Sequence, residues 1–486
     1  MRARELQFRV RPKIVLAIVG QLLGVVAGLT LAPAAVAFVV GDLRFGWRCV
    51  AVVAVLAACA AAARRLPRPR HLQTNEAMVI SVTVFTATPL LMSYAFAATG
   101  LAPMDAVFES FSAVTTTGLS MVADVRGESP AFVFARAWMQ WYGGLGFVVL
   151  SLALVVRPGP LARKLAAPAG NGDDELLGSA RAHGRMVLIV YAAVSAAGFV
   201  ALLVCGSAPF TALVHVLSGI STGGFSSYPD SLGGMEGSAA PLVSTAICLA
   251  GALPLAGYVR VWRHGPGEAW RDPQIATMLA VAAVGSLTLG FVLRAEGNMP
   301  AAEALWHGTI QMVSAQTTSG FSSLDIGALE GGAQTLLLLA MFVGGCSGST
   351  AGGAKLIRAV VAFQVLRAAM WAASAPSHAV VEPRLGGRSL DAGEARALLA
   401  TIVLLVALIA VSWLSFAVAA YPPMASLFEV VSATATVGLS SGITAAELPS
   451  HLKLVLCADM LLGRLECIAV LVALYPRTWV GRQREE

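Results

Sequence analysis

Four short segments of the sequence repeat one pattern of threonine, serine and glycine. In each, a threonine stands two residues before a glycine, a serine stands two residues after it, and a second serine stands six residues before it. The segments are FESFSAVTTTGLS (108–120), VHVLSGISTGGFS (214–226), GTIQMVSAQTTSGFS (308–322) and FEVVSATATVGLS (428–440). A single Thr-x-Gly sequence is common in loops, but four aligned copies at regular intervals indicate an internal repeat.

Such a repeat suits the binding of a dehydrated alkali cation. A cation that leaves water must regain oxygen ligands, and backbone carbonyl groups from four turns around one axis can supply them. Glycine is expected at each turn because successive carbonyls can face one way only with backbone angles that a Cβ obstructs. The short helix before each turn would direct its partially negative C-terminal end at the cation. The residues predicted to bind the cation are Thr116, Thr117, Gly118, Thr222, Gly223, Gly224, Thr318, Ser319, Gly320, Thr436, Val437 and Gly438.

A second pattern is a run of glycines inside the long apolar stretch 334–371. Glycine occurs five times in ten residues, at Gly344, Gly345, Gly348, Gly352 and Gly353. Each glycine costs a helix about 1 kcal/mol, so the helix is expected to break near the middle of the membrane. Non-helical backbone at that depth is tolerated only when it is buried in protein or beside a water-filled cavity. The alternative is a glycine-rich surface for helix packing.

Charged residues inside apolar stretches form a third group of candidates. Arg464 lies in the last apolar run, near Asp459 and Glu466, and a charge at membrane depth indicates a functional site by default. A structural pair with Asp459 or Glu466 is the alternative, although neither spacing places the two side chains on one helical face. Lys355 follows the glycine run and either faces the ion path or extends to the cytoplasmic interface.

The elements that position these residues must be transmembrane helices. The 486 residues are 57% hydrophobic and 12% charged, whereas soluble domains carry about 25% charged residues. The mean hydropathy is +0.76. These values exclude a soluble enzyme, a nucleic-acid-binding protein and a secreted scaffold, and they predict an all-α polytopic membrane protein. Ten apolar runs are long enough to span the bilayer, at roughly 14–40, 48–63, 77–99, 131–156, 186–206, 240–260, 274–293, 334–371, 396–420 and 452–476.

The distribution of charge predicts the orientation of the chain. Lys and Arg are concentrated in the loops on the side of the termini, which places both termini in the cytoplasm and explains the net charge of +6 without nucleic acid. The first apolar run is too long for a cleaved signal peptide, so it is expected to be a retained helix. The opposite face is acidic, which either concentrates cations or reflects ordinary solvated loops. The seven cysteines contain no CxxC pair and indicate neither a disulfide framework nor a zinc site.

The four copies and the spans together predict five segments of the chain. Each repeat is expected to contain a span, a short pore helix with its Thr-x-Gly turn, and a second span. The predicted segments are a two-helix extension at 1–74, repeat 1 at 75–157, repeat 2 at 183–264, repeat 3 with its broken second helix at 270–372, and repeat 4 at 393–479.

With these features the chain resembles the Trk/Ktr/HKT superfamily of potassium uptake proteins, and most closely its TrkH-type members. The resemblance extends over nearly the whole chain. It rests on the four turns and on WMQWYGGLGFVVL (138–150), GGCSGSTAGGAKLIR (344–358) and LLGRLECIAVLV (461–472). The two spans before the first repeat match the extra N-terminal pair of TrkH-type proteins.

The resemblance implies a function and a set of partners. It implies potassium uptake across the bacterial cytoplasmic membrane through a pseudo-four-fold pore, and glycine at all four filter positions favours K⁺ as the transported ion. It further implies a homodimer in membrane lipid and a TrkA-like cytosolic, nucleotide-binding regulatory subunit. The resemblance assigns the gate to the glycine run together with Lys355 and Arg464: the run would obstruct the closed pore, and Arg464 would face the ion path below the filter.

Other activities are weighed against this one. The Gly-Cys-Ser-Gly sequence at 345–348 lacks a histidine placed to activate the serine, and the spacing from Gly348 to Lys355 does not match a phosphate-binding loop. The chain is therefore expected not to be an enzyme and not to bind an organic cofactor. The more serious alternative is a secondary transporter that couples K⁺ to a proton or Na⁺, for which Asp459 and Glu466 would be the only intramembrane carboxylates.

Overall fold

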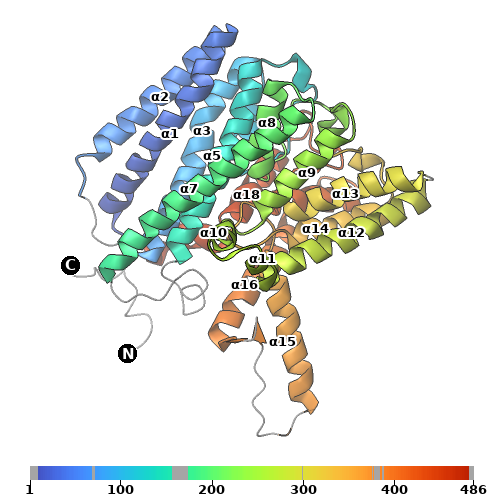
Figure 1. The fold of residues 1–486 in the computed structure, drawn as a ribbon. Helices are drawn as coiled ribbons and strands as arrows, with labels where there is room; N and C mark the ends of the chain where they lie inside the picture. The colour runs from blue at the N-terminus through green and yellow to red at the C-terminus, as the bar shows by residue number, and fades with distance from the viewer. Residues whose placement is uncertain are drawn as a thin grey trace.

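The computed structural model describes residues 9–67, 72–155, 173–297, 299–374, 376, 384–385 and 388–480, and these are almost entirely helical (Figure 1). The long helices are α1 (Pro12–Val40), α2 (Leu43–Ala63), α3 (Thr74–Phe96), α5 (Pro130–Val155), α7 (Asp173–Val204), α12 (Pro273–Gly297), α15 (Leu356–Ser374) and α16 (Ala392–Val418). The shorter ones are α4 (Pro103–Val114), α8 (Pro209–Ile220), α9 (Ala239–Ala252), α10 (Leu255–His264), α11 (Gly267–Arg271), α13 (Ala301–Thr317), α14 (Gly331–Val343), α17 (Pro423–Thr434), α18 (Ser450–Arg464) and α19 (Ile468–Leu474). Two-residue strands, β1 (Arg384–Leu385) and β2 (Arg388–Ser389), pair antiparallel.

The predicted polytopic membrane fold is confirmed, but the predicted count of ten spans is not. Within the described ranges, seven helices are long and apolar enough to cross a membrane, or eight if the bent pair α9 and α10 counts as one span. Two expected spans are interrupted by changes in local backbone conformation. In 240–260 the chain bends by 89° at Leu253-Pro254, because the residue before a proline avoids helical angles. In 452–476 helix α18 ends at Arg464, and Glu466 has a left-handed φ of 55°.

Four sets of three helices form the body of the molecule. We call them unit 1 (α3, α4, α5), unit 2 (α7, α8, α9), unit 3 (α12, α13, α14) and unit 4 (α16, α17, α18). In each unit the short middle helix packs against the helices on either side of it. The last helix of each unit also packs against the short helix of the next, in the pairs α5 with α8, α9 with α13, α14 with α17, and α18 with α4. The fourth unit therefore closes onto the first. The residue boundaries of the predicted repeats stay a prediction.

The two N-terminal helices lie along one side of this body (Figure 1). Helices α1 and α2 form a hairpin, and α1 packs against α3 and α5. Close packing within the hairpin depends on small residues, because Gly20 faces Ala63 and Gly24 faces Ala60. The two ends of the described chain lie together, because Val10 N donates to the carbonyl of Thr478 at 2.9 Å.

Helix α15 projects from the body beside α16, as Figure 1 shows. It begins directly after the glycine-rich segment, by which we mean residues 344–355 between α14 and α15. Four of its large apolar side chains are exposed: Phe363, Leu366, Met370 and Trp371. Helix α15 is therefore joined through the backbone directly to the glycine-rich segment.

Candidate ion pore

The four short helices all end at the Thr-x-Gly turns, and their sequences explain both ends. A proline occupies the first position of α4, α8 and α17, where its missing N–H costs nothing, and Pro300 precedes α13. At the C-terminal end each helix closes with the same pair of hydrogen bonds. The N–H of the threonine bonds to the carbonyl three residues back, and the N–H of the next residue bonds to the carbonyl of the repeated serine, at 2.8–3.2 Å in all four copies.

This pair of hydrogen bonds is a Schellman motif with an unusual residue in its left-handed position. Glycine or asparagine normally occupies that position. Here it is threonine four times, with φ of 56° at Thr116, 53° at Thr222, 57° at Thr318 and 50° at Thr436. A β-branched residue in this conformation costs on the order of 1 kcal/mol, and such strain clusters at functional sites. The repetition of the strain in four copies points to a role for the threonine side chain.

The four glycines of the turns form a closed ring. Each has a positive φ, of 92° at Gly118, 75° at Gly224, 71° at Gly320 and 98° at Gly438. A Cβ at any of them would collide with a carbonyl oxygen of the following unit. The pairs are Gly118 with Gly223, Gly224 with Ser319, Gly320 with Val437, and Gly438 with Thr117. The structure thus brings all twelve predicted cation-binding residues to one place, with the backbones of adjacent units in contact.

In units 1 and 4 the repeated serine six residues before the glycine bonds to the backbone of the turn, whereas Ser218 Oγ of unit 2 has no hydrogen-bond partner among the described residues. In unit 1, Gly118 N donates to Ser112 Oγ at 3.0 Å, and the same hydroxyl donates to the carbonyl of Leu119 at 2.6 Å. In unit 4, Gly438 N donates to Ser432 Oγ at 3.0 Å. These serines are therefore part of the turn itself rather than of its exposed face.

A second ring of side chains, which the sequence analysis missed, braces the serine that follows each glycine. The residue nine positions before the glycine reaches this serine in every unit. The pairs are Glu109 with Ser120 at 2.6 Å, His215 with Ser226 at 3.0 Å, Gln311 with Ser322 at 2.9 Å, and Glu429 with Ser440 at 2.5 Å. The residue type differs between copies, but each can hydrogen-bond a hydroxyl. The fixed spacing of nine was the available signal.

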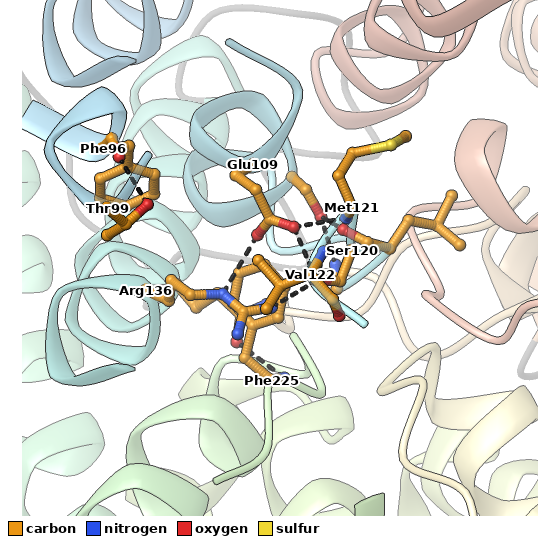
Figure 2. Close-up of polar contacts among 12 residues, drawn as sticks. Phe96, Thr99, Glu109, Ser120, Met121, Val122, Arg136 and Phe225 are labelled. Atoms are coloured by element: carbon orange, nitrogen blue, oxygen red, sulfur yellow. Dashed lines mark hydrogen bonds and ion pairs between the residues drawn. The ribbon is translucent and has the colours of Figure 1, made fainter. Parts of the chain in front are cut away.

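Unit 1 adds an ion pair to this second ring (Figure 2). Glu109 accepts from Ser120 Oγ and Met121 N with one carboxylate oxygen, and its other oxygen lies 3.1 Å from Arg136 Nε. Arg136 also donates to Ser120 Oγ at 2.9 Å, and its guanidinium lies 3.8 Å from the ring centre of Phe225. Both charged side chains are buried. Arg136 therefore connects the turn of unit 1 to the residue that follows Gly224 in unit 2.

A cavity of about 230 Å³, which we call the vestibule, lies against the serine side of the turns. Its lining includes all four turn glycines and the four serines that follow them. The charged residues in its lining are Arg136 and Asp325. The vestibule therefore gives solvent a route to the ring of glycines from this side.

The glycine-rich segment covers the threonine side of the turns. Gly352 N donates to Thr318 Oγ1 at 2.6 Å, and a Cβ at Gly352 would collide with Thr436 Oγ1. Thr350 Oγ1 lies 3.4 Å from Thr222 Oγ1 and within 2.9 Å of the carbonyls of Ile220 and Gly251. The segment thus reaches three of the four strained threonines. Two of the four hydroxyls, Thr116 Oγ1 and Thr436 Oγ1, are buried and have no hydrogen-bond partner among the described residues, although Gly352 lies close to Thr436.

The remaining glycines of the run shape the segment. Gly344, Gly348 and Gly353 have positive φ values of 69°, 74° and 73°. Gly345 lies against Ala252 of α9, and a Cβ at Gly344 would collide with the carbonyl of Gly352. The segment is therefore folded back on itself between units 2 and 4. All five predicted gate glycines lie within it.

The two predicted gate cations lie on the segment as well. Arg464 is buried at the end of α18, and its Nη1 donates to the carbonyl of Thr350 at 2.7 Å. Lys355 is also buried, and its Nζ donates to the carbonyl of Ala351 within the segment, so it does not extend to an exposed interface. Glu466 forms an ion pair with Arg358 at 2.6 Å, and Asp459 accepts from Ser412 Oγ at 2.7 Å.

Glycines in the last helices of units 1, 2 and 4 permit close approach to the turns. A Cβ at Gly143 would collide with the carbonyl of Val114, at Gly251 with Ile220, and at Gly463 with Thr434. The corresponding glycine of unit 3 is Gly345, which lies outside α14 because that helix ends at Val343. Unit 3 alone therefore lacks this helix contact, and its chain turns beneath the ring instead.

Comparisons with known proteins agree with this architecture. The sequence model of the TrkH family, described as cation transport protein, matches residues 42–258 and 277–478. The "Trk system potassium uptake protein TrkH" of Halomonas elongata is 30% identical over 424 residues, which cover 84% of this chain and 87% of that protein. TrkI of the same organism is also 30% identical, over 82% of each chain.

A solved structure shows the same fold. The crystal structure of the potassium transporter TrkH from Vibrio parahaemolyticus superposes with a TM-score of 0.86 at 27% identity, covering 97% of this chain and all of that one. The resemblance inferred from the sequence motifs is thereby confirmed. The chain belongs to the TrkH family of cation transport proteins.

Proposed function

We propose that this chain takes up potassium ions across the bacterial cytoplasmic membrane through a channel-like pore, with both termini in the cytoplasm. The observation that carries the proposal is the closed ring in which each turn glycine lies against a carbonyl of the next unit. The relatives from Halomonas elongata and the Vibrio parahaemolyticus structure are named as potassium uptake proteins or transporters. A membrane potential of −100 mV supplies about 2.3 kcal/mol per charge, which suffices for uptake without a coupled ion.

The twelve residues of the four Thr-x-Gly turns are proposed as the selectivity filter. Their backbone carbonyls would replace the hydration shell of K⁺. Thr116 Oγ1 and Thr436 Oγ1 support a further site at the inner end of the filter, because a buried hydroxyl without a protein partner is costly unless a ligand satisfies it. The strained threonine conformation would present these oxygens toward the axis.

The glycine-rich segment, Lys355 and Arg464 are proposed as the gate. The segment lies beneath three of the four filter threonines, where it obstructs the path from the filter to the cytoplasm. Arg464 holds it there through the carbonyl of Thr350. Opening would require the segment to leave Thr222, Thr318 and Thr436.

We infer two partners from the family resemblance. The chain would form a homodimer in the lipid bilayer, and a TrkA-like cytosolic subunit that binds nucleotide would control the gate. Helix α15 supports such control, because it projects from the body and continues directly from the glycine-rich segment. Removal of the regulatory subunit should therefore change flux without changing ion selectivity.

Expression in a bacterial strain without its own potassium uptake tests the function. The chain, with and without a TrkA-like subunit, should restore growth at limiting K⁺, whereas Arg464 and filter variants should alter that growth. Failure in both combinations, with the protein present in the membrane, would overturn the proposal.

Electrophysiology distinguishes a passive pore from the alternative, the coupled transport of K⁺ with a proton or Na⁺. Its strongest support is Asp459, a buried carboxylate in α18 whose Oδ1 accepts from Ser412. In a passive pore the reversal potential follows the K⁺ gradient and does not move when a pH or Na⁺ gradient is imposed. A shift that Asp459→Asn abolishes would establish coupling.

A further inference from the structure

The side chain of Gln140 reaches from unit 1 into the filter turn of unit 2. Gln140 lies in α5 and is fully buried. Its Nε2 donates to the carbonyl of Gly223 at 2.5 Å, and its Oε1 accepts from Phe225 N at 3.2 Å. One amide group therefore holds the backbone on both sides of Gly224.

The turn of unit 2 has a gap that this amide fills. The residue before the turn glycine carries a side chain in the other three units, where it is Thr117, Ser319 or Val437, and in unit 2 it is Gly223. A Cβ at Gly223 would lie 2.6 Å from Gln140 Oε1 and 2.7 Å from Nε2. Because real Cβ atoms do not approach other atoms so closely, Gly223 and Gln140 are complementary: the absent side chain leaves the space that the amide occupies.

The carbonyl that Gln140 binds is also part of the ring contact between units 1 and 2. The oxygen of Gly223 is the one that a Cβ at Gly118 would strike. A hydrogen bond to this oxygen fixes its direction and draws electron density away from the cation side. Selectivity for K⁺ over Na⁺ is attributed to the size of the site and to the number and field strength of its carbonyl dipoles.

We propose that Gln140 is a positioning residue for ion selectivity, which sets the orientation of the Gly223 carbonyl and thereby the width of the filter between units 1 and 2. The proposal rests on the assignment of the four turns as the selectivity filter. Gln140 lies outside the four Thr-x-Gly segments. It belongs to unit 1 and holds the turn of unit 2.

Replacement of Gln140 by a side chain of similar length without polar atoms tests the role. Gln140→Met should lower the K⁺/Na⁺ permeability ratio about twofold to twelvefold, the range that one neutral hydrogen bond provides. The ratio is measured from reversal potentials in bilayers or liposomes, together with the yield of folded protein. The matched control is Gln334→Met, which makes the same change at a buried glutamine in α14 whose Nε2 donates to the carbonyl of Ile326.

A compensation experiment tests the contact between Gln140 and Gly223 on which the proposal rests, even if Gln140→Met folds poorly. Gly223→Ser alone should reduce folded yield and flux, because its side chain meets the Gln140 amide. Combined with Gln140→Ala it should regain both, because unit 2 then carries the Thr-Ser-Gly-Phe sequence of unit 3 (318–321) and has room for it. Failure of Gln140→Ala to improve Gly223→Ser would contradict the complementarity of the two residues.

The outcomes separate this proposal from the assignment of the filter. If Gly118→Ser changes the permeability ratio while folded Gln140→Met does not, the filter stands and the role of Gln140 is wrong. If neither substitution changes the ratio, the turns are not the selectivity filter.

Discussion

The carbonyl oxygen of Thr117 lies against the α-carbon of Gly438, so the last turn of the chain closes onto the first. The same relationship joins each earlier turn to its successor. Homotetrameric pores obtain such a ring from identical subunits, whereas here one chain supplies four copies with different sequences. Each contact can therefore be altered singly.

Gly118→Ser should weaken selection against Na⁺. The new Cβ would strike the carbonyl of Gly223, and a serine is strained at the φ of 92° found at this position. Because the displaced carbonyl is a proposed K⁺ ligand, we expect the K⁺/Na⁺ permeability ratio to fall, as measured from reversal potentials under bi-ionic conditions.

The control for Gly118→Ser is Gly237→Ser. Gly237 also has a positive φ, of 73°, but nothing lies within 4 Å of the position of its Cβ. It should cost similar backbone strain, about 1–3 kcal/mol, without changing selectivity. Equal permeability ratios in the two variants would mean that strain alone, and not the ring contact, accounts for any effect.

Thr350→Val should increase flux by releasing the glycine-rich segment. The hydroxyl of Thr350 bonds to the carbonyls of Ile220 and Gly251, both at 2.9 Å, and valine has the same shape without the hydroxyl. We expect a higher open probability in single-channel recordings and an unchanged permeability ratio. Thr309→Val, at a half-buried residue of α13 whose hydroxyl bonds to the carbonyl of Leu305 in its own helix, is the control. A reduced open probability would show that these hydrogen bonds do not hold the closed state.

Arg464→Ala should also raise flux, because it removes a different contact of the glycine-rich segment. Arg464 Nη1 donates to the carbonyl of Thr350, so its removal takes away a tether of the segment and also a positive charge from the proposed ion path. The measurement is ⁸⁶Rb⁺ uptake into liposomes normalised to the amount of folded protein. Unaltered flux with a collapse of the folded yield would identify Arg464 as a structural residue.

The predictive value of the sequence depended on repetition. The turn glycines and threonines were predicted because four copies show the same residues, and the ring places them together. The second ring was missed because its positions hold Glu109, His215, Gln311 and Glu429, whose shared property is hydrogen bonding and not identity. Gln140 was missed because it has no counterpart in the other copies, and its role depends on a tertiary contact with Gly223.

The number of membrane spans was also predicted only in part, because it depends on where helices bend and end. Hydropathy identified apolar runs correctly but could not show that 240–260 bends by 89° or that α18 ends at Arg464. Both interruptions lie beside the glycine-rich segment, where polar backbone can be satisfied by neighbouring units. A structural pair of Arg464 with Glu466 was the alternative to a pore role at the level of sequence; in the structure Glu466 forms an ion pair with Arg358 near the start of α15.

The ion pair between Lys453 and Asp105 should contribute strongly to the stability of the ring. Lys453 of α18 binds Asp105 of α4, both are buried, and the pair joins unit 4 to unit 1. Asp105→Ala leaves a buried ammonium group that, among the described residues, keeps a hydrogen bond to the carbonyl of Ala446 at 2.7 Å, so it should lower the free energy of unfolding by about 3–5 kcal/mol. Glu268→Ala, which removes the partner of the exposed Arg271, should change it by less than about 1 kcal/mol. Thermal unfolding in detergent measures both changes.

The double variant Asp105→Leu with Lys453→Met should recover most of the lost stability, because two apolar side chains fill the site without a buried charge. If the double variant remains as unstable as Asp105→Ala, the loss of stability arises from packing and not from the unpaired charge.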